Sequence, residues 1–209
     1  MTKNKIKVAL IGNPNTGKTS VFNALTGLNQ HVGNYPGVTV EKKFGEFHLN
    51  NQTDAVLLDL PGTYSLNSNS LDENIVTELL LNPSSKDFPD VAVVVAEPEN
   101  LKRNLLLFSQ VKELNIPTIL LINMSDRMDL KGISIDIEAL SKELKTTICT
   151  VSARKNKGFD ALKLAILDHA SLDTSSLHDA LVFDHTYFEG LQQAFPNQNL
   201  YSLWLKVSH

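Results

Sequence analysis

Residues Gly12 to Thr19 read Gly-Asn-Pro-Asn-Thr-Gly-Lys-Thr, and this stretch decides the fold class. It matches G-x-x-x-x-G-K-[ST], a pattern whose glycines let the backbone wrap a phosphate so that its amides face the negative charge. An apolar run, Ile6 to Ile11, precedes the loop, and Thr19 to Leu28 follows with the spacing of a helix. A phosphate site at a helix N-terminus is therefore predicted, with Lys18 on the terminal phosphates and the Thr19 hydroxyl on magnesium.

Two further loops are predicted to complete the phosphate and magnesium contacts. Asp59-Leu60-Pro61-Gly62 follows an apolar strand. The Asp59 carboxylate is expected to hold magnesium through water, and the Gly62 amide to sense the terminal phosphate. Gly33 to Glu41 reads as a Gly/Pro-containing switch loop, in which Thr39 would add a second hydroxyl to the magnesium.

The base of the nucleotide is predicted from two short motifs. Asn123-Met124-Ser125-Asp126 resembles the guanine motif N-K-x-D. An aspartate at its end accepts hydrogen bonds from the ring N–H and the exocyclic amine of guanine, and adenine lacks both donors. Asn123 would brace the surrounding loops. Ser152-Ala153-Arg154 resembles S-A-K, whose backbone amide meets the guanine carbonyl.

Four of these motifs stand in order at the ends of expected buried strands, where ligands of open α/β sheets bind. They are Gly12–Thr19, Asp59–Gly62, Asn123–Asp126 and Ser152–Arg154. They predict an α/β fold of the Ras-like P-loop GTPase type: a six-stranded, mostly parallel sheet with helices on both faces, binding GTP or GDP with magnesium. The expected strands are 6–11, 42–49, 55–60, 91–96, 118–123 and 147–151. The expected helices are 19–28, 71–81, 101–114, 136–144 and 159–170.

The C-terminal part is predicted to be a separate unit. The Ser-rich stretch 171–176 marks the boundary, so that 1–170 forms the G domain and 171–209 a linker with a short or partial helical domain. Leu200, Leu203, Trp204 and Val207 recur at helical spacing there.

The bulk properties narrow the class of protein. A net charge of −4 over 209 residues gives no reason to expect a nucleic-acid partner. The single cysteine, Cys149, excludes an intrachain disulfide and a cysteine-based metal cluster, and favours a reducing, cytosolic setting. No apolar run reaches the roughly 18 residues that a membrane helix needs, so this piece is expected to be soluble.

Two positions depart from the Ras pattern. Met124 stands where a lysine usually packs along the nucleotide, so weaker binding and faster GDP release are expected. Thr63 stands where Ras has a water-positioning glutamine, so slow intrinsic hydrolysis is expected.

These departures are part of a resemblance to the FeoB family, ferrous iron transport protein B. The residues that carry it are Gly12–Asn23, Asn34–Glu41, Asp59–Leu66, Asn123–Asp126 and Ser152–Arg154, with looser similarity at Leu71–Asn74 and Asn100–Leu105. The resemblance extends over residues 5–170. Glu97-Pro98-Glu99 departs from the Asp-Ala-Thr-like stretch of the family, which bears on local loop geometry rather than on chemistry.

The resemblance implies more than the residues do. It implies a helical domain and a membrane-spanning iron permease beyond this part of the same polypeptide, at the cytoplasmic face of the bacterial inner membrane. It also implies a potassium ion, coordinated by Asn15, that stabilises charge during hydrolysis as an arginine finger does elsewhere. The six histidines lack ligand spacing, so direct iron binding by this part is not expected.

Two other functions stay open: a soluble GTPase of ribosome assembly or tRNA modification, and a GTP/GDP sensor with negligible turnover. The oligomeric state is open too, a homo-oligomer included. The expected nucleotide contacts are Asn13, Asn15, Thr16, Gly17, Lys18, Thr19, Ser20, Gly37, Val38, Thr39, Asp59, Gly62, Asn123, Met124, Asp126, Ser152, Ala153 and Arg154. Among the site residues, those expected to act in catalysis are Asn15, Lys18, Thr39 and Gly62.

Overall fold

The computed structural model describes residues 4–28, 30–35, 41–67, 71–171 and Leu205. Three expected site residues, Gly37, Val38 and Thr39, lie outside the described residues. The expected helical unit over 171–209 also lies outside them, apart from Ser171 and Leu205.

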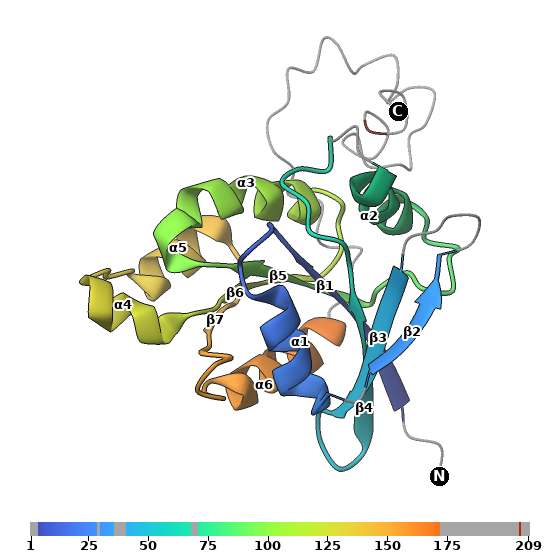
Figure 1. The fold of residues 1–209 in the computed structure, drawn as a ribbon, viewed down its shortest axis with the longest axis horizontal. Helices are drawn as coiled ribbons and strands as arrows, with labels where there is room; N and C mark the ends of the chain where they lie inside the picture. The colour runs from blue at the N-terminus through green and yellow to red at the C-terminus, as the bar shows by residue number, and fades with distance from the viewer. Residues whose placement is uncertain (1–3, 29, 36–40, 68–70, 172–204, 206–209) are drawn as a thin grey trace.

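A single sheet of seven strands organises the described chain (Figure 1). The strands are β1 (Asn4–Gly12), β2 (Gln30–Asn34), β3 (Glu41–His48), β4 (Thr53–Asp59), β5 (Val91–Ala96), β6 (Thr118–Ile122) and β7 (Ile148–Thr150). Their order across the sheet is β2-β3-β4-β1-β5-β6-β7. Pairing is parallel from β4 to β7, whereas β3 runs antiparallel to both β2 and β4.

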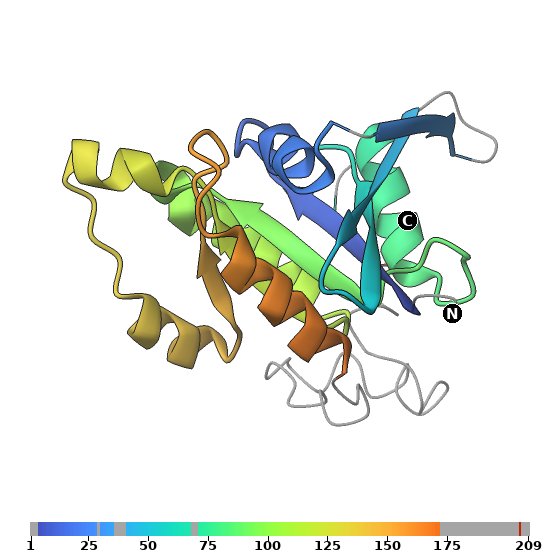
Figure 2. The ribbon, with the colours of Figure 1, turned by 90° about the horizontal axis from the view of Figure 1, so that it is seen from below.

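Helices cover both faces of this sheet, as predicted (Figure 1, Figure 2). They are α1 (Lys18–Thr26), α2 (Leu71–Leu81), α3 (Leu101–Lys112), α4 (Ser125–Lys131), α5 (Ile137–Leu144) and α6 (Phe159–Ala170), with a 3₁₀ turn η1 (Pro98–Asn100). Side chains of α1 and α6 pack into the core on one face. Those of α2, α3 and α5 pack on the other.

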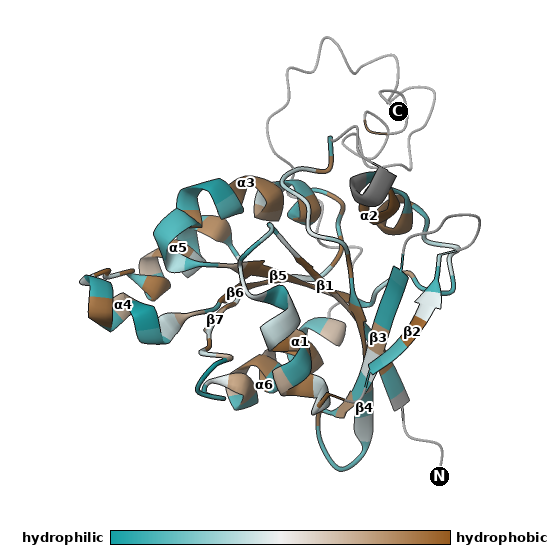
Figure 3. Ribbon diagram, in the orientation of Figure 1, coloured by the Kyte–Doolittle hydropathy of each residue, from teal (hydrophilic) through white to brown (hydrophobic). Residues whose placement is uncertain are grey.

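The central strands are buried on both faces, which is why they appear in the sequence as continuous apolar runs between helical segments. Every residue of β5, Val-Ala-Val-Val-Val-Ala, is buried, as a parallel strand covered on both faces requires. Figure 3 shows the same concentration of hydrophobic residues along the middle of the sheet. These strands therefore hold the loops at their carboxyl ends on a rigid base.

The strand count of six was wrong, because β2 was not predicted. Its sequence, Gln-His-Val-Gly-Asn, is mostly exposed and lacks alternation, so its strand character comes from pairing with β3. The segment 42–49 was expected at the sheet edge, but β2 takes that place. Phe47 and Leu49 are both buried, as the alternation predicts.

Helix α4 was also not predicted. It begins inside the guanine motif, at Ser125, and contributes no buried side chain, so it has no apolar face for a sequence pattern to reveal. None of the helices in the described ranges is long and apolar enough to cross a membrane.

Candidate nucleotide-binding site

The four predicted motifs meet at one edge of the sheet. They follow β1, β4, β6 and β7, which run parallel, so their carboxyl ends point the same way. Adjacent strands bring the first two motifs into contact: the Thr63 amide donates to the Gly12 carbonyl at 3.2 Å. The edge is the place where ligands of open α/β sheets bind.

The loop after β1 forms a pocket at the start of α1. Its lining residues are Asn13, Pro14, Asn15, Gly17, Lys18, Thr19 and Gly62. Gly17 caps α1 in the left-handed conformation, with φ 79°, and no side chain bonds the first amides of the helix. Those amides and the positive end of the helix dipole are therefore open to an anion.

Lys18, which lines this pocket, forms an ion pair with Asp59 at the end of β4, and both side chains are largely buried. The contact brings the residue expected on the phosphates against the residue expected on magnesium. With nucleotide and magnesium bound, Lys18 would pair with a phosphate and Asp59 with the hydrated cation. Ligand binding would therefore replace the Lys18–Asp59 ion pair with these two contacts. The Thr19 hydroxyl lines the same pocket, and one carboxylate with one hydroxyl fits the sparse protein ligation that magnesium has beside phosphates.

Asn123 ties the base motif to two other loops. Its Nδ2 donates to the Thr16 carbonyl at 3.0 Å, and its Oδ1 accepts from the Ala153 amide at 3.1 Å. The side chain is buried, with 2% exposed. The bracing role predicted for Asn123 therefore has a definite geometry: one amide group clamps the phosphate loop and the 152–154 loop together.

Asp126 is held by Ser152, whose hydroxyl donates to its carboxylate at 2.6 Å. This hydrogen bond is the main cause that lowers the pKa of Asp126, and Lys155 and Arg154 add to it. The carboxylate thus stays ionised and ready to accept hydrogen bonds. From the sequence, the 152–154 loop was expected to contribute only a backbone amide to the guanine carbonyl. The hydrogen bond from the Ser152 hydroxyl to Asp126 was not predicted.

Met124 takes the left-handed conformation with φ 59° and lies against the phosphate loop. A Cβ atom placed on Gly17 would come within 3.2 Å of Met124 Cε and within 2.4 Å of Asn123 Nδ2. Glycine is therefore required at position 17 both by its φ and by this close approach. Methionine supplies the packing against the loop that a lysine stem would give, without the charge.

The segment after Gly62 turns away from the pocket. Thr63 is fully buried, and its hydroxyl donates to the Ser65 carbonyl at 2.7 Å, so it does not stand where a water-positioning side chain would. Helix α3 holds this segment through Gln110, which contacts the Leu66 amide at 2.9 Å and the Ser65 hydroxyl at 3.0 Å. The sequence carried no signal for Gln110.

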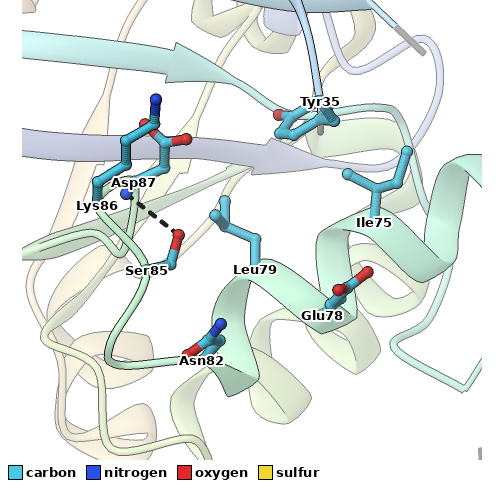
Figure 4. A pocket seen from close by; sticks show the side chains of 8 residues that line it. All are labelled: Tyr35, Ile75, Glu78, Leu79, Asn82, Ser85, Lys86 and Asp87. Carbon is cyan, nitrogen blue, oxygen red and sulfur yellow. Dashed lines mark hydrogen bonds between the residues drawn. The ribbon is translucent and has the colours of Figure 1, made fainter. Parts of the chain in front are cut away.

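A separate pocket lies beyond the phosphate site, between α2 and the loop that follows it (Figure 4). Tyr35, Ile75 and Leu79 form its apolar part. The Tyr35 hydroxyl is buried and has no hydrogen-bond partner among the described residues. Burial is the main cause that raises the pKa of this phenol far above its usual range. None of the predicted nucleotide contacts lines this pocket.

Known proteins resemble this chain over most of its length. The family model described as "Ferrous iron transport protein B" matches residues 6–166. The chain belongs to the FeoB family. The Fe(2+) transporter FeoB of Salmonella typhimurium is 42% identical over 177 residues, which cover 83% of this chain but 22% of the relative. The chain thus spans about a fifth of the length of the curated FeoB relatives it matches.

Solved FeoB structures share the fold. The cytosolic domain of T. maritima FeoB in a GDP form aligns with a TM-score of 0.86 at 35% identity, covering 97% of this chain and 79% of that one. The isolated G domain of T. maritima FeoB aligns with a TM-score of 0.73 at 40% identity, covering 80% of this chain and all of that one. The Ras-like α/β fold predicted from the motifs is confirmed.

Proposed function

We propose that this chain binds guanine nucleotides and hydrolyses GTP to GDP and phosphate. The observation that carries the proposal is the convergence at one sheet edge of an open helix N-terminus beside Lys18 and an ionised Asp126 braced by Ser152. The helix N-terminus with Lys18 suits a chain of phosphates, and the Asp126 carboxylate suits the two hydrogen-bond donors of guanine. FeoB relatives solved with GDP support the same ligand.

In hydrolysis, a water oxygen forms a bond to the γ-phosphorus while the bond from that phosphorus to the bridging oxygen breaks. GDP leaves with the bonding electrons, and the proton of the water ends on phosphate or solvent. Lys18 and the amides around Gly17 stabilise the charge on the transferred group. Magnesium, when bound, neutralises the β- and γ-oxygens, and Thr19, Asp59 and Thr39 are proposed to hold it.

Slow turnover stimulated by potassium is proposed in place of a glutamine-assisted reaction. Thr63 is buried and offers no side chain to the attacking water. Asn15 is exposed, lines the phosphate pocket and has φ 69°, and its side-chain amide oxygen is the ligand that we propose for the monovalent cation. A sensor with negligible turnover is the second candidate, and the same buried Thr63 favours it. Membership of the FeoB family disfavours a ribosome or tRNA role.

The biological role we propose is regulation or driving of ferrous iron uptake by a membrane permease of the same polypeptide. Support comes from the family and from the fraction of the relatives that the chain covers, 22%. The described residues include no group of three or more histidine, cysteine, aspartate or glutamate side chains suited to a metal ion. That iron is handled by other parts of the polypeptide stays a proposal that rests on the family.

Phosphate release from GTP in potassium and in sodium buffer tests the proposal. We expect clear stimulation by potassium in the wild type, loss of that stimulation in Asn15→Ala, and loss of all turnover in Lys18→Ala. Equal rates in both salts would remove the potassium step. GDP binding without turnover in either salt would leave the sensor as the function.

A further inference from the structure

Helix α4 carries the guanine-selecting residue but is weakly held by packing. It has seven residues and contributes no buried side chain, and Leu130 is 83% exposed. Asp126 lies in its first turn. Since the hydrophobic effect scales with the apolar area removed from water, this helix gains little from it. Its position depends on polar contacts.

Glu99 makes two of those contacts. Its carboxylate accepts from Arg127 at 2.5 Å and from Lys131 at 2.6 Å. Arg127 and Lys131 are four residues apart, so they lie on one face of α4. The Lys131 hydrogen bond is the first cause that lowers the pKa of Glu99, and the carboxylate is thereby kept ionised.

The turn that carries Glu99 is itself fixed to the core. Pro98 is buried, and the Glu97 amide donates to Oδ1 of Asn104 at 2.9 Å. Asn104 belongs to α3 and is 2% exposed. Glu97-Pro98-Glu99 is the stretch that departs from the pattern of the family. In this chain the stretch forms a turn fixed to α3, and its Glu99 carboxylate faces α4.

Arg127 connects the Glu99 turn to the base motif. It follows Asp126 directly, and its Nη1 lies 3.6 Å from Sδ of Met124. Met124 in turn packs on Gly17 of the phosphate loop. A shift of Arg127 would therefore disturb both Met124 and Asp126 of the base motif.

We propose that Glu99 is a positioning residue for guanine recognition, which holds α4 in place through Arg127 and Lys131 so that Asp126 and Met124 keep their geometry. The proposal rests on the proposed guanine-nucleotide binding. Release of the base requires the 123–127 segment to move away from it. The two ion pairs of Glu99 with Arg127 and Lys131, here called the tether, oppose that movement and slow GDP release.

The expected effect follows from the exposure of the pairs. Arg127 is 42% and Lys131 48% exposed, so both ion pairs are screened by salt. Loss of two exposed pairs predicts release of a fluorescent GDP analogue about two- to tenfold faster in Glu99→Gln. High salt should bring the wild type close to the variant.

A selectivity measurement separates positioning from general weakening. Inosine diphosphate lacks the exocyclic amine that Asp126 recognises. Loss of positioning should therefore reduce the preference for GDP over inosine diphosphate in Glu99→Gln. The matched control is Glu46→Gln, which removes an ion pair of the same length, Lys5 to Glu46 at 2.6 Å, on β1 and β3 away from the base site. It should alter neither release nor preference.

Hydrogen exchange of the nucleotide-free protein tests the tether without any ligand. Amides of α4 should exchange faster in Glu99→Gln than in wild type, with the rest of the sheet unchanged. Unchanged exchange in α4 would overturn the tether, as would equal release rates, an unaltered GDP preference, or the same effects in Glu46→Gln. Faster exchange in a protein that binds no GDP would keep the tether of α4 and overturn the proposed nucleotide function.

Discussion

Asn123 is predicted to stabilise the empty protein as well as the complex with nucleotide. Its amide group is 2% exposed and joins two loops through the Thr16 carbonyl and the Ala153 amide. Asn123→Ala leaves both backbone groups without this partner. An unpaired buried donor or acceptor costs about 1 to 3 kcal/mol, so the variant should lose about 3 kcal/mol of unfolding free energy.

Urea unfolding of the nucleotide-free protein measures this loss. With a slope of about 2 kcal/mol/M, a loss of 3 kcal/mol lowers the midpoint by about 1.5 M. Asn123→Asp is the conservative control, since it keeps an acceptor for Ala153 and loses only the donation to Thr16. It should fall between wild type and Asn123→Ala. An unchanged midpoint in Asn123→Ala, with only nucleotide binding lost, would refute the clamp.

The remaining predictions concern the base loop and the separate pocket lined by Tyr35. Ser152→Ala removes the main cause that lowers the pKa of Asp126, so the pKa rises toward its ordinary value and GDP binding should be lost at a higher pH than in wild type. Affinity measured from about pH 6 downward through the ordinary pKa of an aspartate, about 3.9, checks this, and coincident curves across that range would contradict it. Met124→Lys keeps the packing on Gly17 and adds a charge at the nucleotide, so GDP release should slow; stopped-flow release at the wild-type rate would sink the idea. Tyr35→Phe removes a buried hydroxyl that has no partner among the described residues, and should raise the unfolding free energy by about 1 kcal/mol in urea; a loss of stability would mean that the hydroxyl is bonded.

The sequence predicted the parts of this fold that depend on strong local patterns. The all-apolar run of β5 and the glycine loop before α1 leave few alternatives. The elements that sequence reasoning missed depend on distant partners. Strand β2 exists because β3 lies beside it, with His31 stacked on Phe44 at 5.3 Å. Helix α4 has no apolar face, so no periodicity marks it.

The candidate site divides in the same way. Motif residues such as Lys18, Asp59 and Asp126 were predicted because their chemistry fits one ligand at a known spacing, and they lie along one edge of the sheet. Supporting residues outside the motifs were not predicted. Gln110 and Glu99 act from other elements through contacts that only folding creates. A supporting residue of this kind has no spacing rule that a sequence alone can reveal.

Guanine selectivity is the claim on which the proposed function depends most. Competition of GDP and ADP against a fluorescent GDP analogue tests it directly, with Asp126→Ala beside the wild type. We predict displacement by GDP and not by ADP in the wild type, and loss of that distinction in Asp126→Ala. Displacement of the analogue by ADP as readily as by GDP, in the protein with Asp126 intact, would contradict the account.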